Sequence, residues 1–204
     1  HRLALLAEDL GYDSVWVSEV ATYDAFALAS AIAVATDRIR IGTAIVPVST
    51  RTPALHAMSL STLGHLAPGR AIAGFGISTE PIVGGWHGQP GVAGRALTHT
   101  RELFDILDQA QTGEKTAYAG SRLSSHGFRL EAPAGAPPKR FLGALGPRMR
   151  RFARDRADGL ILNLTPRSAL REIAAAERRR DGYEIVLPIR IATAEGWTVV
   201  EEAA

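Results

Sequence analysis

The fold of this chain is decided by residues 38–78, which read RIRIGTAIVPVSTRTPALHAMSLSTLGHLAPGRAIAGFGIS. Arg38–Val46 is an apolar, β-branched run that predicts a strand. Thr52-Pro53 then opens a helix, with Thr as N-cap and Pro at the first helical position, where its missing N–H costs nothing. Pro68-Gly69 ends the helix, and Arg70–Gly76 is a second strand. Both strands are apolar on both faces, as in parallel sheets, so we expect a right-handed βαβ unit.

The same alternation of short apolar runs and helical segments continues on either side of this unit. We expect strands in the alternating pattern at residues 14–18, 39–46, 70–76, 140–145, 159–163 and 185–192. A long Gly- and Pro-rich loop at 79–94 and a β-like excursion at 116–130 fall outside it. We expect residues 1–204 to form a single α/β domain. Two architectures fit: an open doubly wound sheet, or a barrel of eight βα units, which typically needs about 250 residues, lacking its first and last strands.

Composition excludes several classes of function. The 204 residues include no cysteine, which excludes disulfides and thiolate chemistry and fits a cytoplasmic protein. No apolar run reaches the roughly 18 residues that span a bilayer, so we expect no membrane segment. The six histidines lack the spacing of metal ligands, so no metal site is predicted. Residues 138–180 carry 12 Lys/Arg against 4 Asp/Glu, but their aromatics are Phe141 and Phe152 alone, which favours solvated helix faces over a nucleic-acid surface.

Polar and small residues follow several of the expected strands, where ligands collect in α/β folds. Gly143–Gly146 runs into a helix beginning at Pro147, and the free N–H groups of such a helix start favour an anion. Gly74-Phe75-Gly76 does not match GxGxxG; its glycines either let a ring or its tail approach the backbone or serve a turn with positive φ. Asn163 ends the next strand, and Thr165 is expected to cap the helix after it.

Seven segments, in this order, resemble the luciferase-like monooxygenase family. They read GYDSVWVSE, RIRIGTAIVPVSTRTP, LAPGRAIAGFGIS, GGWHGQP, RALTHTRELFDIL, FLGALGPRMRRFA and ADGLILNLTP. The chain is most similar to the branch of that family that uses the deazaflavin coenzyme F-420. The resemblance implies a (β/α)8 TIM-type barrel of the bacterial luciferase-like type, incomplete because the first and last strands are missing.

The resemblance also implies where the cofactor is bound. It places a non-prolyl cis peptide near Ala44-Ile45, behind the flavin ring, and the coenzyme's phosphate on the backbone of Gly143–Gly146. The cofactor-binding residues expected on this basis are Ala44, Ile45, Val46, Gly76, Ser78, Gly143, Ala144, Leu145, Gly146, Asn163, Leu164 and Thr165.

The catalytic acid or base is less well defined. His87 follows Trp86 in the long loop and could exchange a proton near neutral pH. Family members often have an acidic residue where Gly84-Gly85 stands, and many have His where this chain has Val20. We therefore take His87, Glu80 and Glu19 as the catalytic candidates.

The function implied by the resemblance is hydride transfer between F-420 and a small organic substrate. Two alternatives stay open: an FMN-dependent monooxygenase of the same fold, and a shortened barrel that binds flavin or F-420 without turnover. A homodimer is expected, because a barrel lacking strands leaves sheet edges to be paired or covered.

Overall fold

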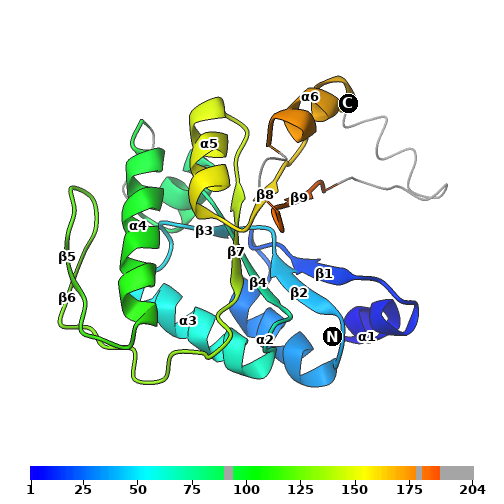
Figure 1. Ribbon diagram of the computed structural model, residues 1–204, viewed down its shortest axis with the longest axis horizontal. Coiled ribbons are helices and arrows are strands. Elements are labelled where there is room, and N and C mark those ends of the chain that lie inside the picture. Colours follow the sequence, from blue (N-terminus) through cyan, green and yellow to red (C-terminus); the bar gives the residue numbers. More distant parts are fainter. Residues whose placement is uncertain (90–93, 178–180, 189–204) are drawn as a thin grey trace.

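The computed structural model of the chain describes residues 1–89, 94–177 and 181–188 (Figure 1). Its helices are α1 (Arg2–Asp9), α2 (Ala25–Ala35), α3 (Pro53–Leu66), the π-helical turn η1 (Pro81–Trp86), α4 (Ala96–Gln111), α5 (Pro147–Arg156) and α6 (Arg167–Glu177). Its strands are β1 (Ser14–Val17), β2 (Arg40–Thr43), β3 (Val46–Pro47), β4 (Ala71–Gly76), β5 (Ala117–Ala119), β6 (Ser124–His126), β7 (Lys139–Gly143), β8 (Gly159–Ile161) and β9 (Glu184–Val186).

One parallel sheet organises the molecule. Its strand order is β1-β2-β4-β7-β8-β9, with β3 paired to β4 beyond the end of β2. Each of the six regions expected to contribute a strand therefore does so, and successive strands along the chain are neighbours in the sheet. Helices α2, α3, α4 and α5 follow one another around the sheet, each packed on the next (Figure 1). This is the arrangement of an incomplete TIM-type barrel, as expected.

The opening βαβ unit forms largely as predicted. The Thr52 hydroxyl accepts the Leu55 N–H at 3.3 Å, and Pro53 begins α3. The expected single strand over Arg38–Val46 is wrong in one respect, because it is divided into β2 and β3. The division falls at a cis peptide bond between Ala44 and Ile45, where the chain leaves its pairing with β1 and continues as β3 beside the end of β4.

The inner face of the sheet is filled by its own side chains. Trp16 of β1 and Phe141 of β7 face each other with ring centroids 5.8 Å apart. Glycines make room for these rings: a Cβ on Gly42 would overlap the Trp16 ring, and a Cβ on Gly159 would lie 2.6 Å from the Phe141 ring. Ring packing against glycine therefore closes the interior of the partial barrel.

An ion-pair cluster at the amino-terminal end of the strands shows how strongly the sheet curls. Arg40 Nη1 of β2 lies 2.6 Å from Glu184 Oε2 of β9, and Lys139 Nζ of β7 lies 2.8 Å from Glu184 Oε1. Strands β2 and β9 are separated by three others in the sheet, so an open, flat sheet would hold these groups far apart. Burial acts to raise the pKa of Glu184, but Lys139 and Arg40 hold it below its ordinary value.

The outer face of the sheet packs on the helices through a chain of aromatic contacts. His56 of α3, Phe75 of β4, Phe104 of α4 and Phe152 of α5 meet edge to face, with successive ring centroids 5.3, 5.9 and 5.5 Å apart. All four side chains are buried. Edge-to-face pairs of this kind add about 0.5–1.5 kcal/mol each to the free energy gained by burial.

Two segments lie outside the alternating pattern. The loop expected at 79–94 is in part helical, because η1 occupies Pro81–Trp86; residues 90–93 lie outside the described residues. The excursion expected at 116–130 is the separate antiparallel hairpin of β5 and β6. Glu102 of α4 holds its turn by accepting N–H groups from Ser121, Arg122 and Leu123 at 2.7–2.8 Å.

The two margins of the sheet differ from the prediction in detail. The last expected strand, 185–192, is described from Glu184 to Val186 as β9, and its residues from 189 onward lie outside the described part. At the other margin a groove of about 700 Å³ runs beside β1 between α1 and α2. Leu3, Leu6 and Leu10 of this region are exposed, so the sheet is open along β1.

Among the described helices, none has the length and apolar character needed to cross a membrane.

Candidate functional site

The predicted cofactor-binding residues lie at one end of the sheet, where the carboxyl ends of its parallel strands meet. Ala44 and Ile45 follow β2, Ser78 follows β4, Leu145 follows β7, and Asn163 follows β8. Because β2, β4, β7 and β8 are consecutive neighbours in the sheet, segments far apart in sequence meet here. This is the position at which α/β barrels bind ligands.

The turn after β2 forms one wall of this site. Its cis peptide lies between Ala44 and Ile45, at the position that the resemblance implied. The side chain of Ile45 lies across β4 and β7: a Cβ on Gly76 would lie 2.8 Å from Ile45 Cγ1, and one on Gly143 would lie 3.1 Å from Ile45 Cγ2. These two glycines therefore accommodate the protein's own Ile45.

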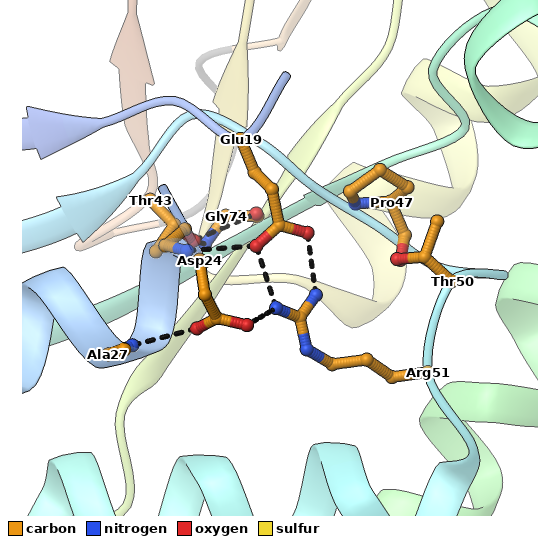
Figure 2. Close-up of polar contacts among 9 residues, drawn as sticks. Glu19, Asp24, Ala27, Thr43, Pro47, Thr50, Arg51 and Gly74 are labelled. Carbon is orange, nitrogen blue, oxygen red and sulfur yellow. Dashed lines mark hydrogen bonds and ion pairs between the residues drawn. The ribbon is translucent and has the colours of Figure 1, made fainter. Parts of the chain in front are cut away.

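The glycines of β4 correct an expectation from the sequence. Gly74 and Gly76 were expected to admit a ring or to serve a turn with positive φ, and neither has positive φ. The space above Gly74 is filled by the backbone carbonyl of Thr43, whose hydroxyl also donates to Gly74 O at 3.0 Å and accepts Gly74 N–H at 2.9 Å (Figure 2). Both glycines are needed where β2 and the following turn approach β4 closely.

Two residues at the strand ends hold an uncommon backbone conformation. Ser78 after β4 has φ of 57°, and Leu164 after β8 has φ of 49°. Non-glycine residues adopt this left-handed region at a cost and concentrate at binding sites. Both residues belong to the predicted cofactor-binding set.

Large apolar side chains are exposed at the same strand ends. Ile77, Leu145 and Leu164 follow the neighbouring strands β4, β7 and β8 and are 36%, 58% and 67% exposed. Trp86, at the end of η1, is 60% exposed. Apolar side chains grouped in this way mark a surface that an apolar ligand can cover.

The start of α5 offers an anion site beside these apolar side chains. Gly146 is the N-cap and supplies no side-chain hydrogen bond, and Pro147 is the first helical residue. The first N–H groups of the helix have no intrahelical partner, and the helix begins directly after the carboxyl end of β7. Arg150 fixes the turn by donating from Nη1 to Leu145 O at 2.5 Å. A Cβ on Gly146 would meet no described atom within 4 Å, so a bound phosphate would have room.

A second polar arrangement, which the sequence interpretation missed, joins the loops after β1 and β3 (Figure 2). Arg51 Nη1 lies 2.6 Å from Glu19 Oε1, and Nη2 lies 2.7 Å from Glu19 Oε2 and also pairs with Asp24 Oδ2. We call Glu19, Asp24 and Arg51 the ion triad. Ala25 N–H donates to Glu19 at 2.8 Å and Ala27 N–H to Asp24 at 2.8 Å, so both carboxylates cap α2. An arginine directly before a helix cap, in a chain segment otherwise apolar or hydroxylated, was the available signal for this arrangement.

The triad is partly withdrawn from solvent. The side chains of Arg51 and Glu19 are each 10% exposed, whereas that of Asp24 is 51% exposed. Burial acts to raise the pKa of Asp24, but the Ala27 N–H and Arg51 lower it below its ordinary value. Both Glu19 oxygens are engaged with Arg51, an arrangement that suits anchoring of the loops better than proton donation.

Two of the three proton-transfer candidates border the same groove, and the third, Glu80, does not line it. Glu19 and His87 border one groove of about 430 Å³. Glu80 precedes η1 and folds over Gly84, so its carboxyl group occupies the space that a side chain at position 84 would take. Within the described part of the chain, no group of three or more His, Cys, Asp or Glu residues is arranged to hold a metal ion.

Comparisons with known proteins agree with this architecture. The luciferase-like monooxygenase family model matches residues 1–204. A protein of Mycobacterium tuberculosis named as a coenzyme F-420-dependent oxidoreductase is 34% identical over 188 residues, which cover 82% of this chain and 52% of that protein. The 5,10-methylenetetrahydromethanopterin reductase of Methanolobus tindarius is 31% identical over 89% of this chain and 57% of its own length. The chain thus spans little more than half of these relatives.

Solved structures show the same fold. The coenzyme F-420-dependent tetrahydromethanopterin reductase of Methanopyrus kandleri superposes with a TM-score of 0.75 at 24% identity, over 91% of this chain and 61% of that one. The EDTA monooxygenase of Chelativorans sp. BNC1 superposes with a TM-score of 0.76 at 16% identity, over 99% of this chain and 58% of that one.

Proposed function

The chain belongs to the luciferase-like monooxygenase family, and on this premise we propose that it is an oxidoreductase that transfers a hydride between coenzyme F-420 and a small organic substrate. The 34% identical protein of Mycobacterium tuberculosis supports F-420 as the cofactor, because that protein is named as a coenzyme F-420-dependent oxidoreductase. FMN is the alternative cofactor, and binding of FMN in its place is an outcome of the test below.

The observation that carries the proposal is the pairing of an apolar surface with an anion site. Leu145 and Leu164 would cover part of the deazaflavin ring, and the exposed Ile77 would extend that cover. The N–H groups at the start of α5 would hold the phosphate of the side chain, with room above Gly146. A ring linked to a phosphate needs both surfaces side by side. Leu145 follows β7 and directly precedes the start of α5, so the apolar surface and the anion site are adjacent in the chain.

The chain's own residues contribute binding, orientation and exclusion of water. When bound, the deazaflavin supplies the redox chemistry by accepting or donating a hydride. Ile45 holds the wall behind the ring by packing on Gly76 and Gly143. Asn163 follows β8 at the same end of the sheet, where its amide would orient the ring or the ribityl chain through hydrogen bonds.

Fluorescence and absorbance titration of the purified chain with F-420 and with FMN tests the proposal. We expect saturable binding of F-420 in the micromolar range and weaker binding of FMN. Tight binding of FMN alone would replace the F-420 oxidoreductase with the monooxygenase alternative. Binding of neither cofactor would contradict both.

A variant of Gly146 tests whether the start of α5 is the phosphate site. Gly146→Leu should weaken F-420 binding at least about tenfold, because the side chain would stand where the phosphate sits. Gly135→Leu is the matched control, since a Cβ on Gly135 also meets no described atom within 4 Å and this residue lies in the linker before β7. Equal affinity of both variants would remove α5 from the site.

The expected homodimer stays a prediction. Sedimentation equilibrium of the purified chain tests it, and a mass of 21.8 kDa at all concentrations would show a monomer.

A further inference from the structure

Val48, directly after β3, anchors the turn that forms the wall of the proposed ring site. Its N–H donates to Gly76 O at 2.9 Å, which extends the pairing of β3 with β4. β3 itself comprises Val46 and Pro47, and the proline has no N–H to donate. The attachment of this segment to β4 therefore depends strongly on the backbone of Val48.

The carbonyl of Val48 is bonded from the helix layer. Val48 is 1% exposed, so solvent does not satisfy this carbonyl. Its partner is the imidazole of His99 on α4, whose Nε2 lies 3.3 Å from Val48 O. Because a carbonyl oxygen can only accept, the ring hydrogen lies on Nε2. The segment after β3 is thus fastened on two sides, to β4 through its N–H and to α4 through its carbonyl.

The surroundings of His99 keep its ring neutral. Burial lowers the pKa of His99 below its ordinary value and Arg122 acts in the same direction, whereas the Val48 carbonyl and Glu102 act to raise it. At pH 7 the ring therefore carries one N–H, and the bond to Val48 uses it. A ring whose hydrogen is engaged in this way supports the backbone instead of exchanging protons with a ligand.

The anchored segment also carries Ile45. The side chain of Ile45 packs where Gly76 and Gly143 lack side chains, and Gly76 O is the acceptor of the Val48 N–H. The end of β4 thus receives both the side chain of Ile45 and the backbone of Val48. A change that lets Val48 move should shift Ile45 across the two glycines, and with it the wall behind the ring.

We propose that His99 is a positioning residue for the cofactor: through the Val48 carbonyl it holds the segment after β3 in place and keeps Ile45 in the wall of the ring site. Its effect on cofactor binding rests on the proposed function, whereas its hold on the turn rests on the contacts within the chain. His99 acts in this role without touching the cofactor.

Three variants test the hydrogen bond. His99→Leu removes the donor and keeps a buried apolar side chain. His99→Gln offers an amide N–H at a similar distance from the backbone and should restore the bond. Thr100→Val is the matched control, because Thr100 is buried on the same helix and its hydroxyl donates to Ala96 O at 2.8 Å, within α4. His99→Leu and Thr100→Val each lose one hydrogen bond, and the bond lost by Thr100→Val does not involve β3.

NMR of the cofactor-free chain measures the hold on the turn. His99→Leu should shift the Cδ1 methyl signal of Ile45 and speed exchange of the Val48 N–H with solvent at least about tenfold. His99→Gln and Thr100→Val should leave both signals close to those of the wild type. Wild-type behaviour of Ile45 and Val48 in His99→Leu would overturn the proposal. If His99→Leu does not fold, the wild-type imidazole spectrum still decides, because a ring hydrogen on Nδ1 would overturn the proposal.

Fluorescence titration with F-420 measures the effect on the site. His99→Leu should weaken binding about threefold to tenfold, the change that one hydrogen bond corresponds to, whereas His99→Gln and Thr100→Val should change it less than about twofold. Equal losses in all three variants, or unchanged affinity of His99→Leu, would overturn the positioning role. A wild-type chain that binds neither F-420 nor FMN, in which Ile45 still responds to His99→Leu, would contradict the proposed function and leave the hold on the turn intact.

Discussion

Replacing Arg51 with methionine removes the cation of the ion triad while keeping a side chain of similar length. Glu19 then loses both of its arginine contacts and retains the Ala25 N–H, in a position where its side chain is 10% exposed. Removing one partner of a buried ion pair costs about 3–5 kcal/mol, because the remaining charge is left without compensation. Asp24 is half exposed and keeps the Ala27 N–H, so we expect the lower end, about 3 kcal/mol.

This loss corresponds to a large shift in thermal unfolding. At about 2–4 °C per kcal/mol for a chain of this size, Arg51→Met should lower Tm by about 6–12 °C. Circular dichroism melting at pH 7 measures the shift, and urea unfolding measures the free energy. Arg101→Met, at an exposed arginine of α4, is the control and should change stability by less than about 0.5 kcal/mol.

A double-mutant cycle separates the ion pair from the loss of packing. Combined with Glu19→Gln, the Arg51→Met change should cost less than the sum of the single changes, with a coupling energy of at least about 1 kcal/mol. Additive effects, or a loss below about 1 kcal/mol for Arg51→Met alone, would refute the structural role given to the triad.

Three further changes test other parts of the structure. Gly76→Ala places a Cβ 2.8 Å from Ile45 and should cost about 1–3 kcal/mol in urea unfolding, whereas Gly146→Ala, in open space, should be neutral. Glu102→Ala removes the acceptor of the turn between β5 and β6, so the amides of that turn should exchange with solvent at least about tenfold faster; unchanged exchange would contradict the role of this carboxylate. Burial lowers the pKa of His56 from 6.5 to about 3, so between these pH values the unfolded chain binds a proton that the folded chain does not. Stability should therefore fall as pH drops from 6.5 to 3, and the fall should be smaller in His56→Leu, measured by urea unfolding at each pH.

The elements that the sequence predicted well are those whose signals are local. Thr52-Pro53 was expected to open a helix, and it does so because the Thr52 hydroxyl and the proline act within one turn. The strands at 70–76 and 159–163 were recognised from uninterrupted apolar runs, which reflect burial on both faces. The position of the cis peptide came from the family resemblance and lies where that resemblance placed it, at Ala44-Ile45.

The features that the sequence did not predict depend on contacts between distant residues. Gly76 and Gly143 are 67 positions apart, and nothing local indicates that Ile45 packs on both. Arg51 and Glu19 are 32 positions apart, so their pairing becomes visible when β1 and β3 are brought to one side of the sheet. The same holds for Glu102, which was treated as part of a helix and holds a hairpin turn about 20 residues later.

For the candidate site residues, the sequence was a better guide to where a residue lies than to what its side chain does. The residues expected to bind the cofactor follow neighbouring strands and lie at one side of the sheet, as parallel topology requires. The proton-transfer candidates were chosen by residue type near the loop, and type alone could not show that Glu19 is held by Arg51 or that Glu80 folds over Gly84.

The most direct test of the central claim is hydrogen–deuterium exchange of the chain with and without F-420. We expect protection at three places: the first turn of α5 after Gly146, the segment from Asn163 to Thr165, and Ile77-Ser78 after β4. These segments end neighbouring strands and would contact the phosphate and the ring. Protection elsewhere with none at these strand ends, or an unchanged exchange pattern at saturating F-420, would contradict it.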